Sequence, residues 1–500
     1  MGTADDAGRM IVVSNRLPVV VSRKGEGAWH LDRGSGGLVT AMEPVLKASD
    51  GLWIGWPGVD ESEIPEVDRL LEEKAAELGY RARGVGLSPD ERDDFYLGFA
   101  NQVIWPLFHD FQTQCNFDPD FRDAYRKVNR RFAEVVAQEA QPGDFIWAHD
   151  YHLMALAEEL RSKGVQGHLG FFLHIPFPPP DFFVKLPWRF GLLQSLLEYD
   201  LLGFQTERDR RNFLQCVATL IPDAKVEKKN GRVVKVAVHG RSVKVGIFPI
   251  SIDVDEFAEL AASEAVSERV AQIWTDFPGR QIILGVDRLD YSKGIPHKLE
   301  GYRLALQRYP ELQEKVSLVQ LVVPSREDIP EYDAMRREIE RLVGRISGEF
   351  TRPGWVPIHY QYGRWERTEL VAHYRAAHVA LVTPLKDGMN LVAKEFCICS
   401  LEGNGVLILS EHAGSTAQLQ RDAILVNPYD VEGVAKAIRQ AVLMPEDERR
   451  RRMQRMRKKI RSQDIYWWVE TFQRAIRDEE MGESEDFEAY PPPTGVEVVE

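Results

Sequence analysis

A segment near residue 390 combines groups that bind phosphate with groups that bind hydroxyls. In VTPLKDGMNLVAKEF, residues 382–396, an apolar strand ends at a charged turn and a helix follows Gly388. Free backbone N–H groups at a helix start attract phosphates, and a glycine lets a ligand approach the backbone. Asp387 and Glu395 can accept hydrogen bonds from hydroxyls. The segment predicts a nucleotide-sugar site, although an ordinary scaffold with a capping Asp and a surface Glu has the same pattern.

A second loop supplies two cations. GVDRLDYSKG follows the strand QIILG and places Arg288 and Lys293 five residues apart. Two cations on one loop can neutralise the charge on a departing diphosphate. Surface ion pairs with Asp287 or Asp290 are the structural alternative for the same residues.

Two segments of the first half place histidines after apolar strands. In GFFLHIPFPPP, His174 meets a Pro-rich loop that would hold its side chain at the mouth of a cleft, and a satisfied structural histidine is the alternative. WAHDYHL contains His149, Asp150 and His152, whose spacing suits convergent metal ligands poorly. We therefore expect Asp150 to accept a hydrogen bond from a substrate hydroxyl, and we expect no metal there.

The N-terminal region adds weaker candidates. SNRLP places Arg16 at the end of a strand, and RGSGGL supplies Gly36 and Gly37 in a loop, although glycine pairs occur in many turns. Aromatic side chains in loop-like segments can stack on sugar rings, although core packing is their usual role. These aromatic residues are Trp53, Trp56, Tyr96 and Trp105.

The elements that must position these residues alternate between short apolar strands and amphipathic helices. Such alternation is typical of parallel sheets covered on both faces, where ligands bind beyond the carboxyl ends of the strands. A Pro-containing segment, GIFPISIDVDEF, marks a boundary near residue 250. The prediction is an α/β protein with two Rossmann-like doubly wound domains, residues 1–250 and 251–477, the second ending in a closing helix.

Charge and cysteine content limit the classes of function. The chain has a formal net charge of −14, but nine acidic residues and no basic one fall in the tail 478–500, which we expect to be disordered. The remainder has no basic excess, which argues against nucleic acid as a partner. No apolar run is long enough to span a membrane. Four cysteines in 500 residues fit a reducing compartment, which predicts a cytoplasmic protein.

Nine ordered motifs point to one family. SNRLP, GGL, GLWIGWPG, NQVIWPLFH, HDYHL, FFLHIPFP, GVDRLDYSKG, VVPSREDIPEY and LVTPLKDGMNLVAKEF occur in this order between residues 11 and 396. Together they resemble the trehalose-6-phosphate synthases, retaining glycosyltransferases of family 20. The resemblance extends over roughly residues 10–475 and implies a GT-B architecture, in which two Rossmann-like domains face each other across a cleft.

The resemblance also implies substrates and site residues. The donor would be UDP-glucose and the acceptor glucose 6-phosphate. The donor-binding residues implied are Gly36, Gly37, His174, Arg288, Lys293, Trp365, Asp387, Gly388, Met389, Asn390, Leu391, Val392 and Glu395. The acceptor-binding residues implied are Arg16, Trp56, Tyr96, Trp105, Asp150 and Arg326. The catalytic set comprises Asp150, His174, Arg288, Lys293, Asp387 and Glu395.

No cofactor and no metal are expected. The two D-x-D motifs, at Asp118–Asp120 and Asp253–Asp255, are predicted to be turn or helix-start carboxylates rather than metal ligands. No side chain is an obvious covalent nucleophile, and retention is implied by the resemblance alone. The alternatives are a related enzyme with another phosphorylated acceptor and a non-catalytic nucleotide-sugar sensor. The sequence does not select UDP over GDP or ADP, and it admits a homo-oligomer.

Overall fold

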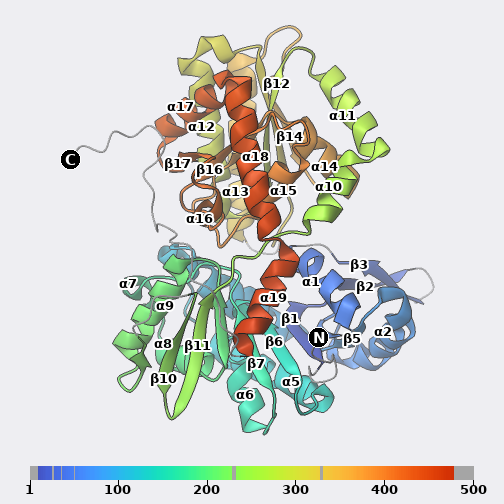
Figure 1. Ribbon diagram of the computed structural model, residues 1–500, viewed down its shortest axis with the longest axis vertical. Coiled ribbons are helices and arrows are strands. Elements are labelled where there is room, and N and C mark those ends of the chain that lie inside the picture. Colours follow the sequence, from blue (N-terminus) through green and yellow to red (C-terminus); the bar gives the residue numbers. More distant parts are fainter. Residues whose placement is uncertain are drawn as a thin grey trace. The chain divides into compact units, whose positions relative to one another are not determined.

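The computed structural model describes residues 9–24, 28–34, 37–49, 51–227, 232–326 and 330–477. The chain forms two compact units (Figure 1). The N-terminal unit runs to Ile250 and also contains the chain from Tyr466, whereas the C-terminal unit runs from Ser251 to Ile465. Among the described helices, none is long and apolar enough to cross a membrane.

The N-terminal unit is built on a nine-stranded sheet of order β5-β4-β1-β6-β7-β8-β11-β10-β9. The strands from β5 to β11 in this order are parallel, and β10 runs antiparallel to both of its neighbours. A separate antiparallel hairpin joins β2 (Val19–Lys24) and β3 (Ala28–Arg33). The sheet strands are β1 Met10–Arg16, β4 Leu52–Trp56, β5 Arg81–Gly84, β6 Phe145–His149, β7 His168–Phe172, β8 Leu201–Phe204, β9 Lys225–Val226, β10 Val233–Val238 and β11 Arg241–Ile247.

Helices of several types connect these strands. The segment η2 (Arg92–Ile104) is a π-helix, a form that is rare and frequently marks functional sites. The other helical elements of this unit are α1 Gly37–Ser49, η1 Glu61–Glu63, α2 Ile64–Leu78, α3 Pro89–Glu91, α4 Trp105–Phe108, η3 Gln112–Gln114, α5 Pro119–Glu139, η4 Tyr151–Leu153, α6 Leu156–Ser162, α7 Pro180–Phe183, α8 Arg189–Leu196, α9 Glu207–Leu220 and α19 Ile465–Ile476.

The C-terminal unit is built on a six-stranded parallel sheet of order β14-β13-β12-β15-β16-β17. Chain order reverses direction between β12 and β15, as at the switch point of a Rossmann sheet. The strands are β12 Gln281–Arg288, β13 Val316–Val323, β14 Ile358–Tyr362, β15 Val379–Val382, β16 Val406–Ser410 and β17 Ile424–Val426. The helical elements are α10 Val254–Ala262, α11 Glu264–Asp276, η5 Tyr291–Lys293, α12 Ile295–Arg308, η6 Pro310–Leu312, α13 Pro330–Phe350, α14 Arg367–Ala376, α15 Leu391–Cys399, α16 Thr416–Leu419, α17 Val431–Leu443 and α18 Glu446–Ser462.

The predicted fold class is confirmed, because both units are α/β with Rossmann-like sheets. The final helix is the exception to the predicted domain division. We expected it to close the C-terminal domain, but α19 packs on the N-terminal sheet. Its Phe472 stacks on Trp147 of β6 with ring centroids 4.4 Å apart. Phe472 also lies where a side chain on Gly170 or Gly203 would collide with it, which explains two glycines inside strands.

Candidate active site

A buried ion pair joins the two strands at the switch point of the C-terminal sheet. Lys293, in the turn η5 after β12, places Nζ 2.6 Å from Oδ2 of Asp387, in the loop after β15. Both side chains are mostly buried, with 11% and 13% of their surface exposed. The predicted partners Asp287 and Asp290 bind Lys298 and Arg326 instead. The structure therefore brings together two predicted site residues that are far apart in the sequence.

The loop that carries Asp387 leads directly into α15. Asn390 donates a hydrogen bond from Nδ2 to Oδ2 of Asp387 at 3.0 Å and adopts a left-handed backbone, with φ 70°. Leu391 begins the helix, and Asn390 gives it no side-chain cap. The initial N–H groups of α15, which include those of Leu391 and Val392, thus lie next to the Lys293–Asp387 pair. This arrangement of a cation and a helix start suits a diphosphate.

Gly388 lies at a close contact between two loops. The residue is buried, and the approach of a ligand to its backbone stays a prediction. A Cβ on Gly414 would lie 1.8 Å from the carbonyl oxygen of Gly388, so the two loops touch through backbone alone. The amide of Ser415 donates to the carbonyl of Met389 at 2.8 Å. The close approach required here is therefore between two segments of the chain.

Glu395 lies about one helical turn after Leu391 in α15. Tyr374 of α14 holds its side chain. The hydroxyl of Tyr374 donates to Oε2 of Glu395 at 2.7 Å. Burial raises the pKa of Glu395, although the hydrogen bond from Tyr374 opposes this shift. The carboxyl group is fixed in direction and keeps a second oxygen for a ligand hydroxyl.

The remaining predicted residues of the C-terminal unit differ in environment. Arg288 is exposed at the end of β12. Arg326 is only 6% exposed and donates from Nη1 to Asp290 at 2.9 Å and to the Tyr332 hydroxyl at 2.6 Å. Trp365 stacks on His373 with ring centroids 4.0 Å apart. Arg326 is thus mostly buried, whereas Arg288 is an exposed residue.

In the N-terminal unit, Arg16 and Trp56 form one feature at the ends of adjacent strands. The guanidinium carbon of Arg16 lies 3.9 Å from the centroid of the Trp56 ring, a cation–π contact. Trp56 is 5% exposed and donates from Nε1 to the carbonyl of Val59 at 2.8 Å. Arg16 therefore covers one face of the ring.

The two predicted aromatic residues near the π-helix also differ. Tyr96, in η2, stacks on His152 with centroids 5.8 Å apart and planes at 17°. Trp105 is 4% exposed and lies against His109, with centroids 4.1 Å apart, so it is mainly a core residue. His152 is itself buried, and within the described chain no three His, Cys, Asp or Glu side chains converge as metal ligands.

Asp150 and His174 follow neighbouring strands, β6 and β7. Asp150 has a positive φ of 74°, a conformation that costs free energy for a residue other than glycine and is common at functional sites. Its Oδ1 accepts a hydrogen bond from the backbone N–H of His174 at 3.3 Å. The His174 ring lies 3.1 Å from that of His149, measured from Nε2 to Nδ1. The structure therefore brings together Asp150 and His174, two members of the predicted catalytic set. Gly37 begins α1, and Gly36 lies outside the described residues.

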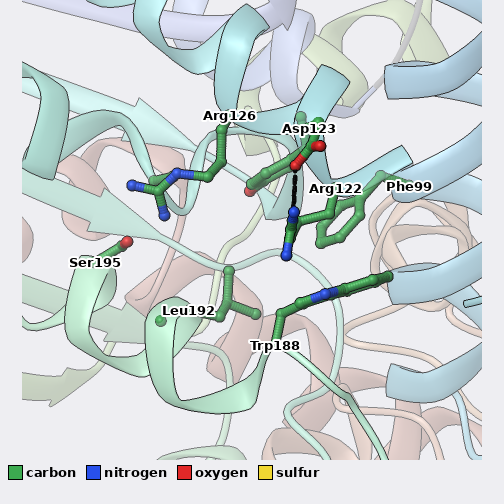
Figure 2. Close-up of a pocket in the computed structure, with 10 residues that line it drawn as sticks. Phe99, Arg122, Asp123, Arg126, Trp188, Leu192 and Ser195 are labelled. Atoms are coloured by element: carbon green, nitrogen blue, oxygen red, sulfur yellow. Dashed lines mark hydrogen bonds and ion pairs between the residues drawn. The ribbon is translucent and has the colours of Figure 1, made fainter. Parts of the chain in front are cut away.

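A cavity of about 290 Å³ lies elsewhere in the N-terminal unit (Figure 2). Arg122 and Arg126 of α5 line it together with Trp188. Arg122 pairs with Asp123 at 2.6 Å and Arg126 pairs with Glu158 at 2.9 Å, so each cation has a carboxylate partner. The cavity contains none of the predicted site residues and no excess of positive charge for a phosphate.

The sequence model of glycosyltransferase family 20 matches residues 8–478. The chain belongs to glycosyltransferase family 20. It is 42% identical over 475 residues to a trehalose-6-phosphate synthase of Mycolicibacterium vanbaalenii, covering 94% of this chain and 96% of the relative. It is 40% identical over 462 residues to the UDP-forming alpha,alpha-trehalose-phosphate synthase A of Dictyostelium discoideum, covering 92% of this chain but only 61% of that relative.

Solved structures of family 20 glycosyltransferases share the fold. A UDP-forming alpha,alpha-trehalose-phosphate synthase from Burkholderia xenovorans in complex with glucose-6-phosphate has a TM-score of 0.83 at 33% identity, covering 94% of this chain and 100% of that one. A trehalose-6-phosphate protein from E. coli bound with UDP-2-fluoro glucose has a TM-score of 0.84 at 36% identity, covering 94% and 99%. The resemblance inferred from the nine motifs, including the GT-B class, is confirmed.

Several residues of this family 20 chain that hold the site were not predicted as site residues. Tyr374 orients Glu395, Asp290 binds Arg326, and His149 contacts His174. Tyr374 lies in a helical stretch with no distinguishing pattern. His149 and Asp290 do stand beside predicted residues in HDYHL and RLDYSKG, so their position at strand ends was an available signal.

Proposed function

We propose that the chain transfers a glucosyl group from UDP-glucose to glucose 6-phosphate with retention and forms trehalose 6-phosphate and UDP. The observation that carries this proposal is the Lys293–Asp387 pair beside the start of α15, at the switch point of the C-terminal sheet. A phosphate-binding group and a hydroxyl-binding group are adjacent there, and a nucleotide-sugar needs both. The relative named a trehalose-6-phosphate synthase and the solved structures with glucose-6-phosphate and with UDP-2-fluoro glucose support the same assignment.

The C-terminal unit would bind the donor and stabilise its leaving group. Cleavage of the bond between glucose and diphosphate places positive charge on the sugar and negative charge on the phosphate. Lys293 has three N–H donors, and Asp387 occupies one of them, so others remain for phosphate oxygens. Arg288 and the backbone N–H groups of α15 add to the positive potential, while Asp387 and Glu395 hold sugar hydroxyls.

The N-terminal unit would supply most contacts to the acceptor. Arg16, on the ring of Trp56, would bind an anionic group through its guanidinium, because a guanidinium forms charge-assisted hydrogen bonds with phosphate. Asp150 would accept a hydrogen bond from an acceptor hydroxyl, and Tyr96 would offer a stacking face. Arg326 is proposed, from the resemblance, to contact the acceptor phosphate.

The reaction in this proposal uses no covalent enzyme intermediate. The departing phosphate oxygen takes the proton of the attacking hydroxyl on the same face of the sugar, so the configuration at the anomeric carbon is retained. The chain contributes charge stabilisation and orientation, which account for most of the rate enhancement in many enzymes.

One assay tests this function. The pure protein is incubated with UDP-glucose and glucose 6-phosphate, and the products are identified by mass. A disaccharide phosphate together with UDP is the expected result. UDP release only with another sugar phosphate would favour a related transferase, and UDP-glucose binding without turnover would indicate a sensor.

A matched pair of variants makes the assay specific to the site. Lys293→Met should lower turnover at least tenfold, because a charge-assisted contact to the diphosphate is lost. Lys315→Met alters an exposed lysine of the same unit and should leave turnover unchanged. Equal activity of the two variants would contradict the assignment of Lys293.

The place of action is part of the proposal. All four cysteines, Cys115, Cys216, Cys397 and Cys399, are unpaired with one another. Free, largely buried thiols are what a reducing compartment permits, and we propose that the enzyme acts in the cytoplasm on small-molecule substrates.

A further inference from the structure

Two histidine rings contact each other where β6 and β7 end. Nδ1 of His149 and Nε2 of His174 are 3.1 Å apart, a hydrogen-bond distance. His149 is fully buried beside the rings of Trp147 and Trp468, with centroids 4.7 and 6.1 Å away. His174 is partly exposed and follows the last residue of β7 by two positions.

Neither imidazole is charged near neutral pH. Burial lowers the pKa of His174 to about 3. Burial, together with the neighbouring His174, holds the pKa of His149 well below its ordinary value. A neutral imidazole carries one proton, on one of its two nitrogens. In a hydrogen bond between two neutral imidazoles, one ring must therefore donate and the other must accept.

The surroundings of His149 decide which ring donates. Its other nitrogen, Nε2, is buried and has no hydrogen-bond partner within the described chain. If His174 donated from Nε2, His149 would carry its own proton on that buried Nε2 without an acceptor. A buried N–H without a partner is rarer and more costly than an unused lone pair. The proton in the contact therefore belongs to His149.

We infer that His149 is a positioning residue that donates from Nδ1 to Nε2 of His174 and so keeps the proton of His174 on Nδ1. His174 then presents one N–H donor, at its more accessible nitrogen. Asp150, the residue after His149, accepts a hydrogen bond at Oδ1 from the backbone N–H of His174 at 3.3 Å and so fixes the backbone of His174. Two consecutive residues at the end of β6, His149 and Asp150, thus fix both the ring and the backbone of His174.

This tautomer matters for catalysis if His174 donates to a hydroxyl of the donor sugar, a step that rests on the proposed function. A fixed N–H donor needs no reorganisation when charge develops in the transition state. Without His149, His174 could carry its proton on either nitrogen, and part of the molecules would present a lone pair instead of a donor. Turnover should then fall, while binding of the acceptor glucose 6-phosphate changes little.

The tautomer can be measured independently of activity. Long-range ¹H–¹⁵N correlation spectra of the full chain, labelled with ¹⁵N-histidine, report which ring nitrogen carries the proton. Resonances of His174 are assigned by their absence in His174→Gln. We expect a protonated Nδ1 and an unprotonated Nε2 near neutral pH. A protonated Nε2 would overturn the inference, whether or not the protein proves to be a transferase.

Three variants test the consequence for turnover. His149→Phe keeps an aromatic ring and removes the donor, and kcat should fall on the order of tenfold to a hundredfold with KM for glucose 6-phosphate little changed. His149→Asn keeps a side-chain N–H and should recover kcat to within about threefold of the parent chain. His168→Phe places the same substitution at the exposed start of β7 and should behave like the parent.

The outcomes separate positioning from packing. If His149→Phe keeps full kcat, or if His149→Asn is as impaired as His149→Phe, His149 does not position His174. If His149→Phe does not fold, the spectrum of the parent chain and the kinetics of His149→Asn still decide. Absence of turnover in the parent itself would refute the proposed function and leave the spectrum as the test of the tautomer.

Discussion

At the scale of single residues, burial of His149 and His174 links stability to pH. The pKa of His174 is about 3 and that of His149 is also far below its ordinary value of 6.5, which both would approach in the unfolded chain. Below pH 6.5 the unfolded state therefore binds protons that the folded state does not bind, and the free energy of unfolding falls as the pH falls. His149→Phe should lessen this slope by about 1.4 kcal/mol per pH unit.

Urea unfolding of the parent and the variant at a series of pH values from neutral to mildly acid measures this slope. His168→Phe removes an exposed histidine and should leave the slope close to that of the parent. Parallel slopes for the parent and His149→Phe would show that His149 is protonated in the folded protein.

Arg326 and Arg288 should serve different substrates. Arg326→Ala removes a charge-assisted contact worth about 1.5 to 3 kcal/mol and should weaken glucose 6-phosphate binding tenfold to a hundredfold. UDP affinity should change little. Arg288→Ala should lower turnover at saturating acceptor, because negative charge on the diphosphate grows toward the transition state.

Calorimetric titrations of each variant with UDP and with glucose 6-phosphate test this division. Tyr332→Phe is a matched control, because it removes only the hydroxyl that accepts from Arg326 at 2.6 Å and keeps the charge. Its effect on acceptor affinity should be smaller. An equal loss of both ligands in Arg326→Ala would mean that Arg326 does not discriminate between the two sites.

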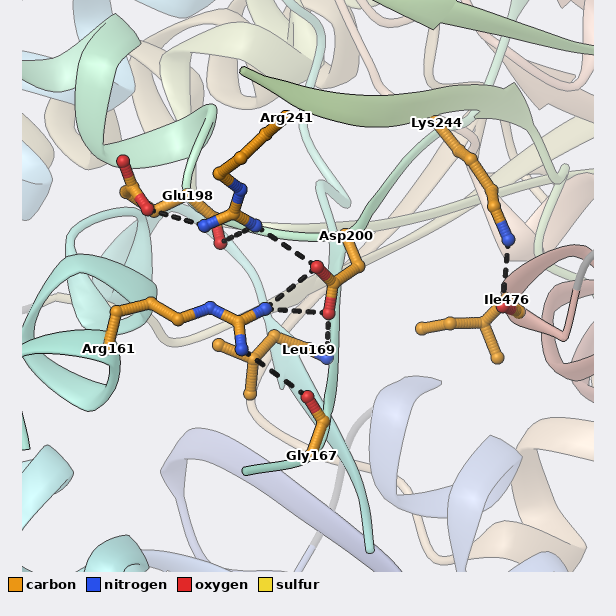
Figure 3. A network of polar contacts seen from close by, with 8 residues as sticks. All are labelled: Arg161, Gly167, Leu169, Glu198, Asp200, Arg241, Lys244 and Ile476. Carbon is orange, nitrogen blue, oxygen red and sulfur yellow. Dashed lines mark hydrogen bonds and ion pairs between the residues drawn. The ribbon is translucent and has the colours of Figure 1, made fainter. Parts of the chain in front are cut away.

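At the scale of elements, a lysine attaches α19 to the N-terminal sheet. Lys244 of β11 is buried and donates from Nζ to the carbonyl of Ala475 at 2.9 Å and to that of Ile476 at 2.8 Å. Figure 3 shows the second of these hydrogen bonds. These carbonyls belong to the last turn of the helix, where a cation is favourable. Nearby, Asp200 accepts from Arg161 and Arg241 at the start of β8. Polar contacts thus supplement the aromatic packing of α19.

Lys244→Met keeps the length of the side chain and removes both hydrogen bonds. It should lower the free energy of unfolding by about 1.5 to 3 kcal/mol. Lys225→Met, on the exposed edge strand β9, is the control and should change it by less than about 0.5 kcal/mol. Thermal or urea unfolding measures the stability of the two variants. Similar stabilities of Lys244→Met and Lys225→Met would show that the hydrogen bonds of Lys244 contribute little.

Strongly patterned elements could be predicted from the sequence. The short apolar runs form strands, for example MIVVSN in β1 and AILVNP in β17. Apolar residues recur at helical spacing in DAMRREIERLVGRI, which lies within α13, and Asp430 caps α17 by accepting from the N–H of Gly433. The basic stretch 447–461 forms α18 with Met453, Met456 and Ile460 buried beneath it. Local periodicity and capping chemistry determine these elements, so a single sequence reveals them.

Elements that depend on distant partners could not be predicted. The placement of α19 follows from Phe472 and Trp147, which are over 300 residues apart. The π-helix η2 has no sequence signature, and the short strands β9 and β5 are set by their neighbours. The site shows the same division. Strand-end residues such as Lys293 and Asp387 were predictable, whereas their mutual contact and the support of Glu395 by Tyr374 required the fold.

At the scale of the whole molecule, the acidic tail 478–500 lies outside the described residues and its disorder stays a prediction. Deletion of Glu483–Glu500 should leave turnover within about twofold and thermal stability little changed, because the tail has few large apolar residues to bury. The deletion keeps α19 and its contact with Lys244 intact. Steady-state kinetics and thermal unfolding check both quantities, and a large loss in either would show that the tail docks on the folded chain.

The last prediction concerns the need for metal, which depends on how the whole molecule neutralises a diphosphate. Both D-x-D motifs begin helices, as expected. Asp118 accepts from the N–H of Asp120 at the start of α5, and Asp253 accepts from that of Glu256 at the start of α10, both at 3.0 Å. Their carboxylates are thus engaged as caps, while Lys293, Arg288 and the start of α15 supply positive potential.

We expect full turnover after treatment with EDTA and dialysis. Asp118→Asn and Asp253→Asn should lower stability by about 1 kcal/mol or less and leave turnover unchanged, because Asn also caps helices. Loss of activity in EDTA that Mg²⁺ or Mn²⁺ restores would show that a metal ion, and not these side chains, carries the charge of the leaving group.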